Sequence, residues 1–497
     1  MRVLETAVVN YSPVSLTAVA ITALSISYII YRTYFDALSH IPGPLICRLT
    51  NLWAWTHSWL GDESRQIDRL HKIYGPVVRI APNEVVFSEG DALGPIYAER
   101  GGFLKAPCYR NFDSEGHETI FSTLSPQHRA VRSKAVMPVF STANIRSRQE
   151  DIEGCVNNFV DRLKKEAEKS RKAKEATGIA SPVDVLNLSR GLAIDSVCAY
   201  LFGKDYGGVH EEDQPELSAS LYVDSVVAFG RFFFLPPWLF VPIYTFLSWL
   251  NPPSKAELAS AEKVNSFTSP LVTKSPREDT YQTRLIKAGC SNHEADVQMK
   301  DVIFAGTDTT GTNFASLLFH LARNPDVYKK LRDEILTSEQ EDPDYNPQNL
   351  KYLDSVLRES LRLSMANPTR FPRVVPPSGF TYSSPATQKS YFLPNGTIVG
   401  LQPWTLHHDL SVFEDPFVFR PERWAEPTKA MLRDFIPFGL GSRMCIARNL
   451  AMFELCLATR AVVRSGVLEN AKTVRERIEV VEWFNAKVVG GRIELVW

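Results

Sequence analysis

One stretch near the start of the chain differs from the rest in its pattern of hydrophobic and polar positions. Residues 14–30, VSLTAVAITALSISYII, are almost continuously apolar, and no charged residue occurs from Thr6 to Tyr31. At ~1.5 Å of rise per residue, a helix of this length comes close to spanning a bilayer. The pattern predicts a single N-terminal membrane anchor. A cleaved signal peptide is the alternative, but Arg2 is a weak basic region and no clear small-residue cleavage site follows.

A second apolar stretch, from Val226 to Leu250, carries only one charged residue, Arg231. Three prolines interrupt it, and a spanning helix that contained them would leave backbone groups unsatisfied in lipid. Two interpretations therefore stay open. The stretch fills the protein core, or it forms an apolar surface that dips into the membrane.

The second half of the chain has mostly helical spacing of its apolar residues, with short strand-like pieces at RVVPP and NGTIVGL. Asn395 and Gly396 in the second piece are a tight-turn signal. No internal repeat and no long Gly/Ser-rich tract divides the chain beyond the first fifty or so residues. We therefore expect one large domain, mainly helical with small β-sheets.

The helical pattern from Val297 to Leu321 is interrupted by six small or polar residues, GTDTTG at positions 306–311. Relative to alanine these residues lose on the order of a few kcal/mol of helix propensity. A threonine hydroxyl can bond the carbonyl four residues back, here Thr309 to Ala305, and free backbone groups for water or a ligand. The small residues suit either the close approach of a flat cofactor or a helix-packing face.

The composition narrows the possible partners. The 497 residues are 44% hydrophobic and 22% charged, with a formal net charge of -1. This is a globular composition without the basic excess of a nucleic-acid-binding protein, so we expect no nucleic-acid partner. The seven cysteines are scattered and include no CxxC pair, which argues against a disulfide framework and a zinc ribbon. A reducing, cytosol-facing compartment fits best.

Three charged residues indicate a buried ion pair. Glu359 and Arg362 are three residues apart in ESLR and neighbour each other on one helix face, where such a pair is usually a weak surface salt bridge. Arg423 stands among aromatic residues in FEDPFVFRPERW. A guanidinium is tolerable in an apolar setting only if a carboxylate meets it, so we expect Glu359 to pair with Arg423.

A lone cysteine, Cys445, stands between a glycine-containing loop and an expected helix in FIPFGLGSRMCIARNLAMFELCLA. Zinc needs about four ligands, and the nearest other Cys or His is Cys456. A cysteine nucleophile needs a base, and only the more distant His407 or His408 could supply one through folding. A zinc site and a nucleophile are therefore the weaker interpretations of this thiol.

Two interpretations of Cys445 remain. An inert buried thiol is common for free cysteine, but it leaves Gly439, Gly441 and Arg443 unexplained. Arg443 and the amide-rich start of the following helix would favour a negative sulfur, and the glycines would let backbone amides turn toward it. This arrangement suits a thiolate held on iron.

The segment FGLGSRMCIA resembles the haem-binding loop of the cytochrome P450 haem-thiolate monooxygenases, in which Phe, Gly, Arg, Cys and Gly recur at this spacing. Ala447 stands where the family usually has glycine. Upstream, AGTDTT at 305–310 is similar to the oxygen-activation motif of the family, and ESLR at 359–362 to its ExxR motif. FRPERW, which contains Arg423, resembles the segment that completes the Glu-Arg-Arg cluster.

The resemblance covers most of the chain after IPGP and is closest to the microsomal, fungal-type members. It implies the cytochrome P450 fold, mainly α with small β-sheets, in a single large haem domain. The implied organisation is an N-terminal membrane anchor over 1–35 and a haem-thiolate catalytic domain over 36–497. Residues 36–48 are then a proline-rich hinge.

The resemblance also implies the cofactor, haem b, with the Cys445 thiolate as the axial ligand of its iron. Basic residues of the family meet the haem propionates, although a tryptophan is more common than histidine at the position of His128. The residues assigned to haem binding in this way are Cys445, Phe438, Gly439, Arg443, Arg132, His128, Arg373 and Ala305.

The implied activity is insertion of one oxygen atom from O₂ into a lipophilic small molecule. Asp308 and Thr309 stand where the family places its proton-delivery pair. Two alternatives stay open: a haem-thiolate isomerase or dehydratase that needs no external electrons, and a non-catalytic haem-binding protein. The first often lacks this pair, and the apolar stretch 226–250 disfavours the second because it suggests a route for a lipophilic ligand.

Electrons are expected to come from another protein, because only about fifty residues follow Cys445 and no nucleotide-binding loop is present in the sequence. The resemblance implies an NADPH-cytochrome P450 reductase, with cytochrome b5 as a second donor. Arg448, Arg460 and Arg464 are candidates for its docking surface, or ordinary solvated charges. The implied location is the endoplasmic reticulum membrane, single-pass, with a cytosolic catalytic domain. A secondary-metabolite intermediate such as a terpenoid, steroid or polyketide is the implied substrate class.

Overall fold

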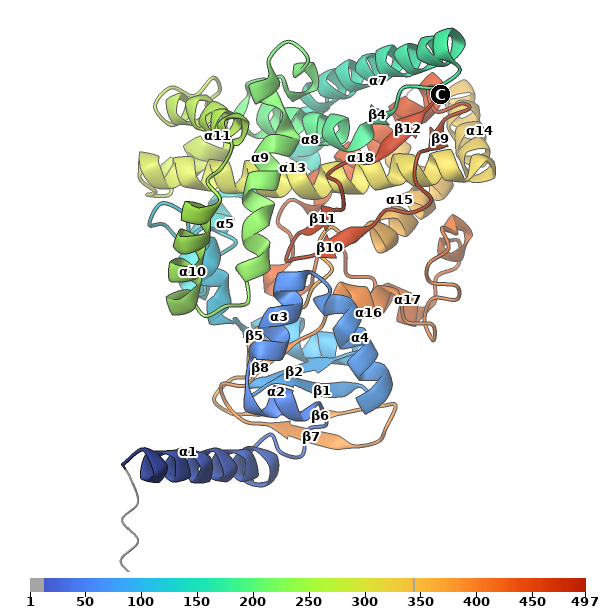
Figure 1. Ribbon diagram of the computed structural model, residues 1–497. Helices are drawn as coiled ribbons and strands as arrows, with labels where there is room; N and C mark the ends of the chain where they lie inside the picture. Colours follow the sequence, from blue (N-terminus) through green and yellow to red (C-terminus); the bar gives the residue numbers. More distant parts are fainter. Residues whose placement is uncertain (1–12, 343–344) are drawn as a thin grey trace, which may run out of the picture.

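The helix α13 (Asn292–Arg323) runs through the middle of the computed structural model, which describes residues 13–342 and 345–497 (Figure 1). Local sequence sets both of its ends. The Ser291 side chain accepts a hydrogen bond from the Glu294 backbone N–H at 3.1 Å and so caps the first turn. At the other end Pro325 disfavours a helical conformation at Asn324, where the helix stops.

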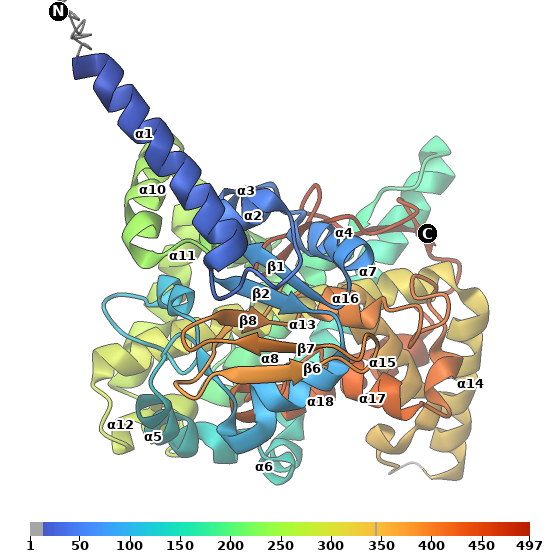
Figure 2. The ribbon, with the colours of Figure 1, turned by 90° about the horizontal axis from the view of Figure 1, so that it is seen from below.

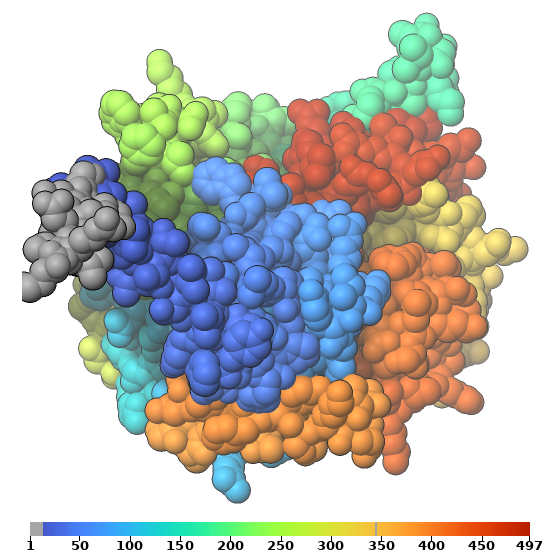
Figure 3. Space-filling view, turned by 60° about the horizontal axis from the view of Figure 1, so that its bottom comes forward, coloured from blue at the N-terminus to red at the C-terminus, as the bar shows by residue number. Residues whose placement is uncertain are grey.

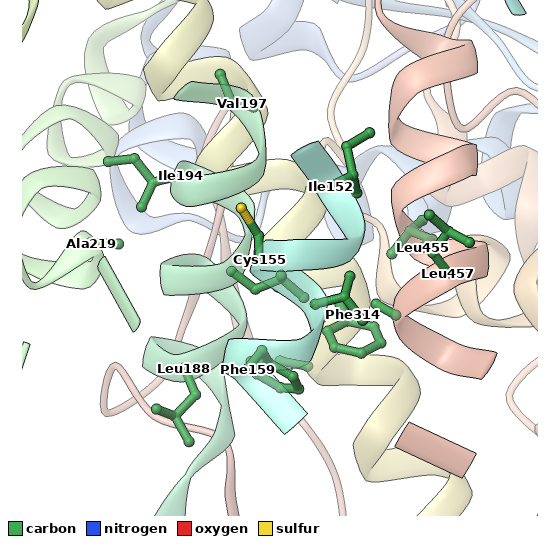
Figure 4. Close-up of a cluster of buried hydrophobic side chains, with 14 of the residues drawn as sticks. Ile152, Cys155, Phe159, Leu188, Ile194, Val197, Ala219, Phe314, Leu455 and Leu457 are labelled. Carbon is green, nitrogen blue, oxygen red and sulfur yellow. The ribbon is translucent and has the colours of Figure 1, made fainter. Parts of the chain in front are cut away.

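The main hydrophobic core lies between α13 and the helices packed along it. α8 (Val185–Phe202) is buried around nearly its whole circumference and lies against α13. Figure 4 shows the centre of this core, where the ring centre of Phe159 on α7 (Gln149–Thr177) lies 5.5 Å from that of Phe314 on α13. The other helices of this region are α5 (Pro126–Val136), α6 (Thr142–Ser147), α9 (Ala219–Val227), α11 (Lys255–Thr268), α12 (Tyr281–Lys287), α14 (Pro325–Glu341), α15 (Lys351–Ser364) and α18 (Arg448–Ser465).

Four small sheets complete the fold of the described residues. The largest has the strand order β1-β2-β8-β5-β3, in which β2 and β8 are parallel and the other pairs antiparallel. The predicted strand pieces form β5 and β8, and Gly396 has a φ of +80° in the turn before β8. The prediction of a mainly helical protein with small sheets is confirmed. The strands of the largest sheet are β1 (Val77–Ala81), β2 (Glu84–Phe87), β3 (Leu104–Lys105), β5 (Arg373–Val374) and β8 (Ile398–Gly400).

The three smaller sheets are built from strands of the C-terminal half together with β4. β12 pairs with both β4 and β9, and two hairpins are formed by β6 with β7 and by β10 with β11. In Figure 3 the early chain, in blue, lies directly beside the orange segment that contains β6 and β7. The bounds are β4 (Val183–Asp184), β6 (Phe380–Ser383), β7 (Ser390–Leu393), β9 (Lys472–Thr473), β10 (Val480–Glu482), β11 (Ala486–Val488), β12 (Glu494–Val496), α16 (Pro403–His407) and α17 (Lys429–Asp434).

The N-terminal helix α1 (Pro13–Ile30) projects from the rest of the molecule (Figure 2). Two described helical segments are long and apolar enough to cross a membrane: Pro13–Phe35, no part of which is buried, and Val185–Phe202, which is 94% buried. The second is the core helix α8, so α1 and its continuation are the segment compatible with a membrane anchor. The first twelve residues of the expected anchor lie outside the described residues.

Hydrogen bonds to Arg79 of β1 hold the segment 36–48 against the rest of the protein. The Arg79 backbone N–H donates to the Pro42 carbonyl at 2.8 Å, and the buried Arg79 guanidinium donates to the Asp36 carboxylate at 3.0 Å. Only the part before Leu45 is non-helical, because α2 (Leu45–Leu49) begins there. α3 (Leu52–Leu60) and α4 (Glu63–Tyr74) follow.

One part of the apolar stretch 226–250 is buried in the protein and another part is exposed, so each of the two interpretations fits a part of it. Phe232 and Phe233 are buried, whereas α10 (Pro237–Leu250) presents large apolar side chains to solvent. α10 lies on the same side of the molecule as α1 in both ribbon views (Figures 1 and 2). Its exposed side chains are Trp238, Val241, Phe246, Trp249 and Leu250.

Candidate functional site

A cavity of about 290 Å³ is lined by the middle of α13 and by the loop that carries Cys445. The loop reaches it through a tight turn, in which the Cys445 N–H donates to the Phe438 carbonyl at 2.9 Å. Gly439 and Gly441 have φ values of +69° and +72°. A Cβ at Gly441 would lie 1.9 Å from the Tyr97 carbonyl oxygen, so only glycine fits there.

The free thiol of Cys445 is exposed to water-sized molecules and lines this cavity. Burial raises the pKa of the thiol, while the Ala447 backbone N–H and the Arg448 guanidinium oppose the rise. Arg443 was expected to supply that positive charge, but its guanidinium donates instead to the Thr123 and Leu124 carbonyls at 3.0 and 3.3 Å. The cation that favours the thiolate is therefore Arg448, at the start of α18.

Four cations line the cavity: Arg373, Arg443, Lys105 and Arg129. In the described part of the chain none of them forms an ion pair with a carboxylate. Burial, together with repulsion by Arg129 and Arg373, lowers the pKa of Arg443 to about 10. Lys105 and Arg373 are buried, and buried cations without a counter-charge call for an anionic ligand. The cluster therefore fits a ligand that brings carboxylates into the cavity, as a haem would through its two propionates.

The structure does not bring His128 and Arg132 to the cavity. Arg132 donates through Nε to the Glu294 carboxylate, and the His128 Nδ1 lies 3.9 Å from Glu118. Their contact with a haem stays a prediction. Arg129, three residues before Arg132 on α5, lines the cavity and was missed because sequence spacing does not fix how a helix is rotated about its axis. Lys105 was also missed as a cavity residue, because a single lysine before a turn has no sequence pattern that predicts ligand binding.

On α13, Ala305 and Thr309 face the cavity. The Thr309 hydroxyl donates to the Ala305 carbonyl at 2.9 Å, which confirms the predicted hydrogen bond. The glycines serve helix packing. A Cβ at Gly311 would lie 2.7 Å from the Cα of Arg190 on α8, and one at Gly306 would lie 2.7 Å from Val197 Cγ2. The small-residue stretch is thus a helix-packing face that also lines the cavity; the close approach of a flat cofactor to it stays a prediction.

Asp308 points away from the cavity into a buried polar cluster. Its carboxylate accepts hydrogen bonds at 2.8 Å from both Arg190 Nη2 and Asn485 Nδ2. Arg190 also lies 3.3 Å from Asp224, a partly exposed residue on α9. Burial raises the pKa of Asp308, and the Arg190 guanidinium opposes the rise. A route of charged side chains therefore leads from Asp308 toward the surface.

The charged cluster around Glu359 is connected by hydrogen bonds to the start of the loop that carries Cys445. Glu359 Oε1 lies 2.8 Å from Arg362 Nη2 and 3.1 Å from Arg423 Nε, so the pairing expected from the sequence is present. Arg362 Nη1 donates to the His407 carbonyl at 2.8 Å, and the His407 Nε2 accepts from the Ile436 N–H at 3.0 Å. Burial would raise the pKa of Glu359, but the two guanidinium groups hold it below its usual value.

Comparison with known proteins identifies relatives of the whole chain. The family model described as Cytochrome P450 matches residues 42–477. The cytochrome P450 monooxygenase mfmF of Annulohypoxylon moriforme is 39% identical over 98% of this chain and 100% of its own length. The cytochrome P450 monooxygenase tazI of Aspergillus terreus is 29% identical over 86% of this chain and 87% of its own length. A pisatin demethylase of Fusarium vanettenii is 27% identical over 91% of this chain and 89% of its own length.

Proposed function

The chain belongs to the cytochrome P450 family, and from this premise we propose that it is a membrane-bound monooxygenase that inserts one oxygen atom from O₂ into a lipophilic small molecule. Members of the family are oxidoreductases that use haem with an axial cysteine thiolate. The observation that carries the proposal is the cavity that Cys445 and Thr309 both line. A terpenoid, steroid or polyketide intermediate of secondary metabolism is the proposed substrate class.

Cys445 is the residue that would hold the haem iron, and Phe438, Gly439 and Ala305 line the same cavity. The haem, when bound, supplies oxygen activation, which electron donation from a thiolate ligand favours. Arg373 and Arg443 would hold its propionates, with Arg129 and Lys105 as further partners. Arg132 and His128 could assist only after leaving their present acidic partners.

Thr309 and Asp308 would deliver protons. The Thr309 hydroxyl stands at the cavity wall, where it can hold a proton toward the reacting oxygen. Asp308 would pass protons from water to that hydroxyl, in a polar cluster that Arg190 and the partly exposed Asp224 extend toward the surface. To do so the Asp308 carboxylate must turn from its partners, because it does not line the cavity.

The exposed apolar residues of α1 and α10 support membrane attachment with a lipophilic substrate entering from the bilayer. We propose an anchor over 1–35 and a catalytic domain over 36–497, which begins with a hinge over 36–48. The proposed location is the endoplasmic reticulum membrane, single-pass, with the catalytic domain on the cytosolic side. An NADPH-cytochrome P450 reductase, with cytochrome b5 as a second donor, would supply electrons. Of the three candidate docking arginines, Arg460 and Arg464 pair with Glu339, which leaves Arg448 the freest to meet a partner.

The first experiment is the carbon monoxide difference spectrum of the reduced, purified full-length protein. We expect a red-shifted, thiolate-type carbonyl band that is lost in Cys445→Ala and Cys445→His. Cys456→Ala is the matched control, because Cys456 is buried on α18 and does not line the cavity. An imidazole-type band in the wild type would refute the ligand assignment.

Turnover then separates the monooxygenase from the alternatives. Product formation that requires both O₂ and NADPH, with the reductase present, supports oxygen insertion. Rearrangement or dehydration without either reagent would instead identify an enzyme that needs no external electrons.

A further inference from the structure

A buried carboxylate joins the hairpin formed by β10 and β11 to a helix from the start of the chain. Glu482, the last residue of β10, is only 1% exposed and lies at the N-terminus of α4. Its Oε2 accepts a hydrogen bond from the Arg65 backbone N–H at 3.1 Å, and its Oε1 lies 2.6 Å from Arg65 Nε. The Ser64 backbone N–H is a further donor to the same carboxylate. The two segments in contact are 417 positions apart in the sequence.

This carboxylate takes the place of a local cap on α4. The first backbone N–H groups of a helix need acceptors from outside the helix. Asp62, the N-cap residue of α4, uses its carboxylate for the side chains of His57 and Gln66, at 2.8 and 2.7 Å. Glu482 supplies the missing acceptor, and a negative charge at a helix N-terminus also interacts favourably with the helix dipole. The hairpin and α4 therefore depend on each other.

Close packing reinforces the contact between the hairpin and the junction of α3 with α4. The Glu482 backbone N–H donates to the Gly61 carbonyl at 2.7 Å, and Trp483 Nε1 donates to the Trp59 carbonyl at 3.4 Å. A Cβ at Gly61 would lie 2.0 Å from Val481 Cγ1. The hairpin is thus seated on this junction by its backbone, by its side chains and by the lack of space between them.

The residues that follow Glu482 reach the cavity and the proposed proton-delivery acid. Phe484 lines the cavity, and Asn485 donates to Asp308 at 2.8 Å. Both lie in the short turn between β10 and β11, within three positions of the capping carboxylate. A shift of Glu482 is therefore transmitted to the cavity wall and to Asp308 through the backbone of one turn.

We propose that Glu482 is a positioning residue: by capping α4 it holds the β10–β11 turn so that Phe484 stays on the cavity wall and Asn485 stays on Asp308. This inference rests on the proposed monooxygenase function, for which Asp308 is the proposed proton-delivery acid. It assigns control of the cavity shape to a contact between two segments outside the cavity lining.

The charges around Glu482 determine how this contact responds to pH. Burial raises the pKa of Glu482 to about 7, Arg65 opposes the rise, and Glu63 of α4 adds to it. A released, solvated carboxyl would have its ordinary, lower pKa, so ionisation favours the released side chain and the contact weakens as pH rises through about 7. The other charged or titratable groups at this junction are Arg370, which pairs with Glu63, and His57, Asp62, Arg231 and Lys487.

The first test is a spectral titration of the full-length holoenzyme with two iron-binding probes. 1-Methyl-1,2,4-triazole and 1-octyl-1,2,4-triazole offer the iron the same nitrogen and stay uncharged from pH 6 to pH 8.5, but only the octyl chain extends along the cavity wall. The measured quantity is the preference for the octyl probe, given by the ratio of the two dissociation constants. In the wild type we expect this preference to fall about threefold from pH 6 to pH 8.5.

Two variants assign the pH dependence to the carboxylate. Glu482→Gln keeps an acceptor oxygen and carries no charge, so its preference for the octyl probe should be the same at both pH values. Glu482→Ala removes the cap, so its preference should be low at both. A role in overall stability alone would leave the preference unchanged. A wild-type preference that is constant with pH, or one that varies equally in Glu482→Gln, would overturn the proposal.

Hydrogen exchange of the backbone amides tests the cap directly. Glu482→Ala should speed exchange about tenfold in the segments 61–67 and 480–488 together, because each loses its partner. Faster exchange in neither segment, or in the hairpin alone, would contradict the cap. Glu479→Gln is the matched control: Glu479 stands just before β10 and pairs with Arg477 at the surface, so this variant should match the wild type in both measurements.

The carbon monoxide spectrum of each sample separates the two levels of inference. A thiolate-type band in a wild type whose probe preference does not change with pH contradicts only the role of Glu482. A missing band in the wild type contradicts the proposed function.

Discussion

Asn485 donates a hydrogen bond across 2.8 Å to the carboxylate of Asp308, although 177 positions separate the two residues in the sequence. Asn485 lies between β10 and β11, and its neighbour Phe484 lines the cavity. Asp308, the proposed proton-delivery acid, is thus hydrogen-bonded to the β10–β11 hairpin, and Phe484 of the same hairpin lines the cavity. A substrate that moves Phe484 would act on the same chain segment that holds Asp308.

The contact between Asn485 and Asp308 gives a graded prediction. Asp308→Asn should lower coupled turnover by about 100-fold, because the relay loses its ionisable group. Asn485→Ala should fall between this variant and the wild type, because Arg190 still holds the carboxylate. The measurement is product formed per NADPH consumed, together with the solvent isotope effect on turnover. Wild-type values for both variants would exclude Asp308 from proton delivery.

Loss of the Thr309 hydroxyl should uncouple the enzyme. In Thr309→Ala we expect a severalfold larger share of the consumed NADPH to appear as hydrogen peroxide, since no hydroxyl at the cavity wall holds the proton. Thr307→Ala is the control, because Thr307 is buried on the same helix and does not line the cavity. Coupling as tight as in the wild type would defeat the assignment of Thr309.

The Glu359 cluster should be essential for folding and for the cysteine loop. Glu359→Gln leaves the Arg362 and Arg423 guanidinium groups without their buried counter-charge, a loss of about 3–5 kcal/mol. The thiolate-type carbonyl band should therefore be lost at ordinary growth temperature. Glu422→Gln is the control: its pairs with Lys330 and Tyr352 are at the surface, and its effect should stay below about 1 kcal/mol. Equal losses in both variants would count against a special role for the buried cluster.

Packing of α13 on α8 should tolerate no side chain at Gly311. Gly311→Ala would press a Cβ against the Arg190 backbone and should lower the free energy of unfolding by about 1–3 kcal/mol. Gly306→Ala should be milder, because the atom in its way is the end of the Val197 side chain. Gly154→Ala, in open space on α7, should raise stability by up to about 1 kcal/mol. The thermal unfolding midpoint of each variant tests this order.

Much of this protein could be inferred from sequence because its signals are local. The apolar run of α1, the glycines of the Cys445 loop and the four-residue spacing from Ala305 to Thr309 each determine backbone geometry within a few residues. Such short-range patterns report helix type, turn type and the chemistry of a motif. They do not report rotation about a helix axis or contacts between distant segments.

The tertiary structure decided which side chains meet. It placed Arg129 rather than Arg132 at the cavity, made Arg448 rather than Arg443 the positive charge that acts on Cys445, and placed Asn485 beside Asp308. Each outcome depends on how whole helices and hairpins pack, and that packing is set by buried area summed over many residues. The sequence therefore determined the family, the fold class and the position of the candidate ligand thiol. The packing determined the partners of the charged residues.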